Sequence, residues 1–275
     1  MGSNKNGSKE GHDQRQIAAT ETWLQHEREF YRWQAEKIDL IEDTLKGLRR
    51  HGALVDVGCF TGWATARYKA LGFARAVGLD ISEFALERAA NKGIEPRSWH
   101  AGAERCPAGD GEFDTVIAAD VIEHIVDTDA FLSELHRILT PRGTMIVTTP
   151  NLAFWLSRIR LLLGKPPWSY PGTSPTVRAD VMIDLNHIRV NTRREWEALF
   201  GKSEFDVRRA RGWSILHAHG ASIGVRLRRA VDRVMTRRPE TAFGLLFGVG
   251  KKRLKRAGGA LAGGESTASG GTGVA

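Results

Sequence analysis

The chain has 275 residues, of which 41% are hydrophobic, and this length and composition suit a protein that buries a full core. No run approaches the roughly 20 apolar residues of a membrane span, and the first residues lack the apolar centre of a secretory signal. The two cysteines, Cys59 and Cys106, predict neither a disulfide framework nor a metal site and indicate a cytoplasmic location, while the net charge of +8 suggests an anionic partner.

The chain begins with a polar segment followed by a helical pattern. Residues 1–18 are rich in Gly, Ser and Lys, and we expect them to be a disordered tail. A single domain is expected over 19–256, and its first part, 19–50, has apolar side chains near helical spacing, which predicts a helical cover. Tyr31 and Trp33 in this cover are expected to pack on the core, although an aromatic ring could instead face a bound cation.

A glycine-rich turn after residue 57 is the most informative feature of the chain. The apolar run 53–57 predicts a buried strand, and a helical pattern starts directly after Gly62. A strand, a tight turn and a helix N-terminus in this order are how a doubly wound sheet holds a nucleotide-like ligand. A second predicted strand, 76–80, ends in Asp80, whose carboxylate is placed to accept hydrogen bonds from two ribose hydroxyls.

The alternation of strands and helices continues to residue 150. We predict a helix over 82–92 with Ser82 as its N-cap, and strands near 96–100 and over 113–119. A helix over 128–139 is expected to be stopped by the turn 141–143, before a strand at 144–148. This order predicts an α/β fold, a Rossmann-like doubly wound, mostly parallel seven-stranded sheet with helices on both faces, whose cofactor-binding core is 51–150.

The regular alternation of strands and helices ends after Pro150. Residues 151–190 hold an apolar helix over 152–163 and a loop rich in Pro, Gly and aromatic residues, and an insertion of this length suggests a substrate-binding role. Aromatic side chains in it could form an apolar acceptor pocket or a lid that packs on itself; they are Trp155, Trp168 and Tyr170. Beyond it, a helix capped at Thr192 with Glu195 in a capping box, a strand at 205–211 and a last strand at 243–249 are predicted.

The C-terminal part, 205–256, is basic. It carries 14 Lys or Arg residues against three acids, and its segment 222–238 predicts a basic amphipathic helix. Such a helix suggests peripheral contact with an anionic membrane at its inner face. The alternatives are that its apolar face packs on the sheet, or that the charge only aids solubility. Residues 257–275 are expected to be a flexible tail.

Several segments in chain order carry a family resemblance, namely 55–62, 78–82, 114–124 and 131–143. They resemble the motifs of the class I S-adenosylmethionine-dependent methyltransferases, and the resemblance covers 53–150 well and 180–212 more loosely. The features that look most like the small-molecule O-methyltransferases, including the ubiquinone-biosynthesis type and relatives that modify sugars or lipid-linked glycans, are Glu123–His124, Thr149–Asn151 and Asn186–Arg189. The resemblance implies an O-methyltransferase with S-adenosyl-L-methionine as cofactor, acting on a hydroxyl of a small-molecule, sugar or lipid-linked acceptor.

The resemblance also implies roles for individual residues. Residues that would contact or border the cofactor are Asp56, Gly58, Phe60, Gly62, Asp80, Ile81, Ala103, Glu104, Ala118 and Asp120. His124 and His187 are candidate general bases, since histidine titrates near neutrality, and Asp184 could orient His187. For both histidines the alternative is a structural role.

Two positions depart from the family pattern. Phe60 replaces a glycine, so its backbone must either avoid the left-handed region or carry strain. Gly102 stands where many relatives have an aspartate that bonds the adenine amino group. Both departures could weaken cofactor binding, which leaves a non-catalytic interaction protein with the same fold as one alternative.

The same motifs would also suit a nucleic-acid methyltransferase or an N-methyltransferase. Against a nucleic-acid substrate, no Asn/Asp-Pro-Pro-aromatic tetrapeptide follows the strand at 113–119, where Asp120 and Glu123 stand instead. The oligomeric state and the identity of the acceptor stay open.

Overall fold

The computed structural model describes residues 27–48, 52–167, 187–214 and 223–252. Several predictions lie outside the described residues, namely the two tails, Trp168, Tyr170 and Asp184.

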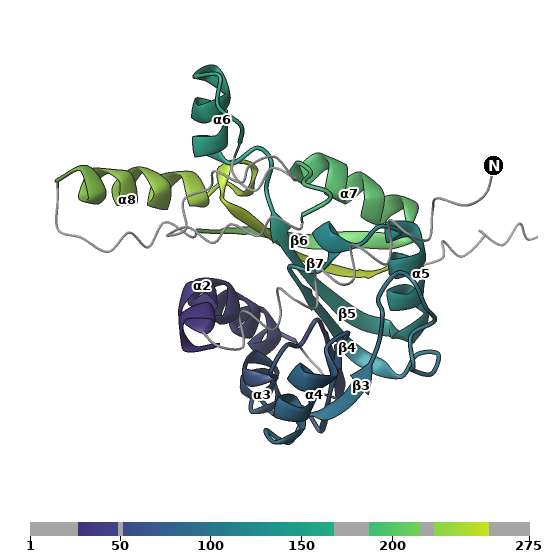
Figure 1. The fold of residues 1–275 in the computed structure, drawn as a ribbon. Helices are drawn as coiled ribbons and strands as arrows, with labels where there is room; N and C mark the ends of the chain where they lie inside the picture. The colour runs from purple at the N-terminus through teal and green to yellow at the C-terminus, as the bar shows by residue number, and fades with distance from the viewer. Residues whose placement is uncertain (1–26, 49–51, 168–186, 215–222, 253–275) are drawn as a thin grey trace, which may run out of the picture.

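The described strands form one seven-stranded sheet in the order β3-β2-β1-β4-β5-β7-β6 (Figure 1). All pairs from β3 to β5 are parallel, whereas β7 runs antiparallel to both β5 and β6. The strands are β1 (Ala53–Val57), β2 (Arg75–Asp80), β3 (Glu95–Ser98), β4 (Phe113–Ala119), β5 (Leu139–Pro150), β6 (Phe205–Trp213) and β7 (Gly244–Lys251). The predicted doubly wound, mostly parallel sheet is confirmed.

Helices cover both faces of this sheet (Figure 1). They are α2 (Glu27–Lys46), α3 (Trp63–Lys69), α4 (Glu83–Ala90), α5 (Thr128–Ile138), α6 (Trp155–Leu162), α7 (Arg193–Lys202) and α8 (Ile223–Thr236), with short 3₁₀ turns η1 (Ile122–His124) and η2 (Pro239–Thr241). Both predicted caps are confirmed. The Ser82 hydroxyl accepts from the N–H of Ala85, and the Glu195 carboxylate accepts from the N–H of Thr192 at 2.7 Å.

Alternating side chains of the strands build two cores. In β1, Val55 and Val57 belong to the core under α5 and α7, whereas Leu54 belongs to the core under α2, α3 and α4. Because successive strand residues point to opposite faces, a strand buried on both sides is apolar throughout. This explains why 53–57 reads as an almost unbroken apolar run.

We predicted that a turn at 141–143 separates the helix from the next strand, and the structure differs. β5 already starts at Leu139, directly after α5, and the prediction of a strand confined to 144–148 is wrong. Leu139 pairs with Phe113 and Thr144 pairs with Thr115, so residues 140–143 bulge out of the strand. Pro141 has no N–H to donate to the ladder, and a bulge is where a strand tolerates proline.

Helix α8 extends away from the sheet (Figure 1). Leu227 is 65% exposed and Val234 is 59% exposed, which contradicts packing of the apolar face on the sheet for these two residues. The buried Asp232 ties α8 to the start of α6, since it accepts from Trp155 Nε1 at 2.9 Å.

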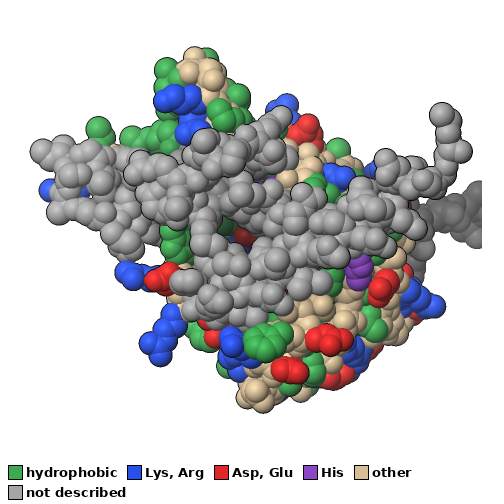
Figure 2. Space-filling model, viewed as in Figure 1, with side chains coloured by type: hydrophobic (Ala, Val, Ile, Leu, Met, Phe, Trp, Pro, Cys, Tyr) green, Lys and Arg blue, Asp and Glu red, His purple; other side chains and the backbone are tan. Residues whose placement is uncertain are grey.

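The far end of α6 is also apolar and exposed. Leu161, Leu162 and Leu163 are all exposed there, and Figure 2 shows hydrophobic and basic side chains next to one another at that end of the molecule. Within the described residues, no helix is both long enough and apolar enough to span a bilayer.

Candidate cofactor and acceptor site

The order of the strands reverses between β1 and β4, and the predicted site residues gather at the carboxyl ends of these strands. Asp56 lies near the end of β1, Asp80 ends β2, and Asp120 follows β4 directly. In open α/β sheets this switch point leaves a crevice between the loops that follow the two strands.

The loop after β1 is shaped by glycines in the left-handed region. Gly58 has φ of 70° and Gly62 has φ of 71°. A Cβ at Gly58 would lie 2.7 Å from Val121 Cγ2, and one at Gly62 would lie 2.9 Å from the Cα of Ala89 in α4. Both positions therefore require glycine, for the backbone angle and for the close approach of neighbouring elements.

Phe60 also lies in the left-handed region, with φ of 51°. Of the two alternatives for this position, the strained backbone is therefore the one that the structure has. Its N–H donates to Asp80 Oδ2 at 2.9 Å, and the other oxygen of Asp80 accepts from the N–H of Ser82 at 2.9 Å. The carboxylate thus ties the loop to the end of β2. The Phe60 ring is half-buried and lies 6.1 Å from the Tyr31 ring, centroid to centroid.

The second departure from the family pattern also has a local cause. Gly102 has φ of 77°, and a Cβ there would lie 2.6 Å from Ile125 Cγ2. An aspartate at this position would need both a strained backbone and a displaced Ile125. The absence of the family's aspartate therefore follows from the path of this loop.

Asp56 is a buried carboxylate. Its Oδ2 accepts from the hydroxyl of Thr65 at 2.6 Å, and burial raises the pKa of Asp56 to about 7, which the Thr65 hydrogen bond opposes. Burial likewise raises the pKa of Asp80, against the backbone hydrogen bonds that it accepts. A buried carboxylate and a half-buried one at the same strand edge favour a ligand that brings positive charge and hydroxyl donors.

Helix α2 closes this edge of the sheet. The Tyr31 hydroxyl lies 3.0 Å from Thr61 Oγ1, and Tyr31 is buried as expected, whereas Trp33 is 45% exposed and does not pack on the core. Lys37 Nζ lies 2.6 Å from Asp120 Oδ2. Sequence reasoning missed Lys37, although it stands four residues before the buried Ile41 and so shares its helix face.

The remaining predicted cofactor residues lie further from this edge. Ile81 is half-buried just after β2, and the exposed Ala103 and Glu104 donate their N–H groups to the carbonyl of His100. Ala118 is fully buried in the core under α5. The structure therefore brings Asp56, Asp80 and Asp120 to one strand edge but places the methyl group of Ala118 in the hydrophobic core.

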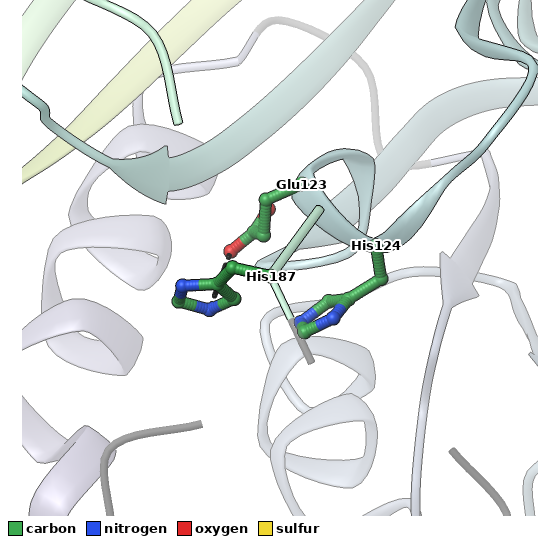
Figure 3. Close-up of side chains that lie close together, drawn as sticks. All are labelled: Glu123, His124 and His187. Carbon is green, nitrogen blue, oxygen red and sulfur yellow. Dashed lines mark ion pairs between the residues drawn. The ribbon is translucent and has the colours of Figure 1, made fainter. Parts of the chain in front are cut away.

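The two candidate bases, His124 and His187, lie close together. His124 ends η1, and its ring centroid is 4.9 Å from that of His187 (Figure 3). Beside them lies Glu123, whose Oε1 is 4.0 Å from His187 Nε2. Burial raises the pKa of the Glu123 carboxyl, and the negative charge of Asp120 raises it further.

The backbone holds His187 at this place. The N–H groups of Ile188 and Arg189 donate to the carbonyl of Glu123 at 3.0 and 3.2 Å. Sequence reasoning singled out both histidines but not Glu123 as a site residue, because no local signal tells that a carboxylate after a strand is buried.

Comparison with known proteins agrees with this geometry. Residues 55–147 match the family model described as a methyltransferase domain. This part of the chain is a methyltransferase domain. It runs from β1 into β5 and so contains the glycine loop, Asp80, Asp120 and the η1 turn.

Curated relatives of the methyltransferase domain are named ubiquinone biosynthesis O-methyltransferases. The one from Caulobacter sp. strain K31 is 38% identical over 111 residues, which are 38% of this chain and 42% of the relative. The mitochondrial one from Dictyostelium discoideum is 30% identical over 125 residues, which are 40% of this chain and 39% of the relative. The chain thus matches about two fifths of the length of these relatives.

Solved structures share the fold over most of the chain. A chain of the complex between the Haloferax volcanii Trm112 methyltransferase activator and a methyltransferase has a TM-score of 0.60 at 17% identity, covering 84% of this chain and 96% of its own. A SAM-dependent methyltransferase from Thermotoga maritima has a TM-score of 0.57 at 19% identity, covering 84% of this chain and 98% of its own. The elements around the methyltransferase domain therefore belong to the same fold.

Proposed function

We propose that this protein is an S-adenosylmethionine-dependent methyltransferase that methylates a hydroxyl group of a small-molecule, sugar or lipid-linked acceptor. The observation that carries the proposal is Asp80, which stands at the end of β2 with its carboxylate tied to the glycine loop within a matched methyltransferase domain. The curated relatives named O-methyltransferases support oxygen as the methylated atom.

The residues present fit the cofactor. The carboxylate of Asp80 accepts backbone hydrogen bonds from Phe60 and Ser82, one on each oxygen, and a ribose hydroxyl could donate to its remaining lone pairs. Asp56 is buried with a hydroxyl as its hydrogen-bond partner, and an ammonium group nearby would balance its charge. The cofactor, when bound, supplies an activated methyl group, and the protein contributes position and electrostatics. Ile81, Ala103 and Glu104 would border the adenine, while Gly58, Phe60, Gly62 and Asp120 would line the methionine side.

His124 and His187 would act on the acceptor. Their ring centroids are 4.9 Å apart, and His124 ends the η1 turn that follows β4 and Asp120 in the chain. Two imidazoles can assist a hydroxyl either by accepting its proton directly or by holding a metal ion that lowers its pKa.

Calorimetric titration of S-adenosylmethionine and S-adenosylhomocysteine tests the cofactor site. We expect saturable binding that weakens at least about 10-fold in Asp80→Ala, since a hydrogen bond to a charged group is worth roughly 1.5–3 kcal/mol. Asp206→Ala, an exposed carboxylate on β6, is the matched control and should bind like the unchanged protein. Absence of binding would favour the non-catalytic interaction protein; binding allows a screen of sugars and phenols as acceptors.

We also propose that α8 contacts an anionic membrane surface at the periphery. The exposed Leu227 and Val234 stand beside the exposed basic residues Arg226, Arg233 and Arg237, which is the composition of an interfacial helix. The test is sedimentation with vesicles of phosphatidylcholine, with and without phosphatidylglycerol. Binding that needs the anionic lipid and is lost in a Leu227→Glu, Val234→Glu variant is expected; equal binding of that variant would refute the contact.

A further inference from the structure

Phe60 stands in a backbone conformation that favours glycine. Its φ is 51°, and it lies in the loop between Gly58 and Gly62, whose φ angles are 70° and 71°. A side chain in the left-handed region is penalised, whereas glycine, the residue of the family pattern, is not. Strained residues of this kind gather at ligand sites, where the surrounding structure holds them in place. The penalty therefore indicates a role for the phenyl ring that glycine could not fill.

Contacts on two sides hold Phe60 beside the carboxylate of Asp80. Its N–H donates to Asp80 Oδ2 at 2.9 Å, and its ring lies 6.1 Å from the ring of Tyr31, centroid to centroid, at an angle of 52°. Tyr31 is fixed in turn, because its hydroxyl lies 3.0 Å from Oγ1 of Thr61, the next residue of the loop. Phe60 is nevertheless only half-buried. Part of its surface therefore stays open next to the carboxylate proposed to bind the ribose.

Helix α2 places these rings on the methionine side of Asp80. The helix contacts the glycine loop through Tyr31, and further along it Lys37 lies 2.6 Å from Asp120, at the end of β4. The ring of Phe60 therefore lies between α2 and the strand edge that carries both aspartates. In S-adenosylmethionine the positively charged sulfur joins the ribose to the methionine chain, so it would lie between the groups held by Asp80 and by Asp120.

We propose that the ring of Phe60 makes the site prefer the sulfonium cofactor to its neutral product, S-adenosylhomocysteine, with Tyr31 as a positioning residue. The face of an aromatic ring attracts a cation, and the uncharged sulfur of the product receives no such attraction. A site with this preference releases the product readily after methyl transfer. The inference rests on the proposed function, since it concerns the same cofactor.

Calorimetric titration of both ligands into the full-length protein tests the proposal. The measured quantity is the dissociation constant of S-adenosylhomocysteine divided by that of S-adenosylmethionine. We expect this ratio to fall about 5-fold in Phe60→Leu, which keeps an apolar side chain but loses the aromatic face. Phe60→Tyr keeps the face and should keep the ratio. Tyr31→Leu should lower the ratio at least about 2-fold, because the ring of Phe60 then loses its support.

Two controls separate the ring from other causes. Trp33→Leu removes an exposed aromatic side chain of the same helix and should leave the ratio unchanged. Asp80→Ala should weaken both ligands by the same factor, because both carry the ribose. The ratio is taken within each variant, so a general loss of affinity cancels. An unchanged or higher ratio in folded Phe60→Leu would overturn the proposal.

The same titrations separate this inference from the proposed function. Binding of neither ligand to the unchanged protein would reject the cofactor site, and the preference with it. Binding of both ligands with a ratio that does not depend on Phe60 would leave the cofactor site standing and reject only the role of the ring. Circular dichroism identifies a variant that fails to fold, and Phe60→Met is a second substitution without an aromatic face.

Discussion

The carboxylate of Asp80 accepts a hydrogen bond of 2.9 Å from the N–H of Phe60, and that residue is held at a φ of 51°. The bond joins the end of β2 to the loop after β1, across the edge where we place the cofactor. A strained residue at such a place persists because the surrounding structure over-determines it. The strain at Phe60 can be measured by comparing two substitutions.

Phe60→Gly and Phe60→Ala both remove the ring that lies near Tyr31, but only alanine keeps the left-handed penalty. We expect the glycine variant to be more stable than the alanine variant by about 1 kcal/mol. Urea denaturation of both variants gives the difference. Equal stability would show that Phe60 carries no backbone strain.

Stability should depend on pH through Asp56, whose pKa is raised from 3.8 to about 7 by burial. Between these values the folded protein binds more protons than the unfolded chain, so this residue makes the free energy of unfolding fall as pH rises from about 4 to 7. Asp56→Asn removes the effect. Its stability relative to the unchanged protein should therefore rise across this window, by up to about 1.4 kcal/mol per pH unit.

Denaturant titrations at several pH values from about 4.5 to about 7.5 measure this difference across the window in which linkage applies. The exposed Asp206→Asn serves as the control and should follow the unchanged protein at every pH. If the free energy of unfolding of Asp56→Asn differs from that of the unchanged protein by the same amount at every pH, Asp56 has the same pKa in the folded and unfolded states.

The ion pair between Lys37 and Asp120 should couple strongly, because Lys37 is buried and the two charges are 2.6 Å apart. A double-mutant cycle with Lys37→Met and Asp120→Asn is expected to give a coupling free energy of about 2 kcal/mol. The surface pair of Arg67 and Asp39, at 3.0 Å, is the matched comparison and should give less than about 1 kcal/mol. Similar coupling in both cycles would argue against a buried pair.

Gly102→Asp, which introduces the family's residue, should destabilise the protein. A Cβ there would meet Ile125 at 2.6 Å, whereas a Cβ at Gly164, which has a similar φ of 67°, would have nothing within 4 Å. We expect Gly164→Asp to lower the free energy of unfolding by about 1 kcal/mol, and Gly102→Asp to lower it by about 2 kcal/mol more than that. Thermal and urea unfolding of both variants check the prediction, which fails if the two costs are equal.

Local chemistry made much of the fold predictable. The strands over 53–57 and 113–119 match β1 and β4 residue for residue, since apolar runs between turn residues have few other solutions. The caps at Ser82 and Thr192 were predictable because a cap depends on neighbours within one helical turn. The bulge at 140–143 could not be predicted from the sequence, because the register of β5 there depends on its pairing with β4.

The sequence by itself determined the alternation of strands and helices, the glycine loop and the carboxylate at the end of β2, because each depends on residues close together in the chain. Only the tertiary structure decided that Lys37 is buried against Asp120 and that Glu123 lies without hydrogen-bond partners among the described residues, beside His187. These facts depend on which elements meet in space and on how fully they exclude water. Burial and proximity of that kind arise from packing between distant segments, and no local pattern contains them.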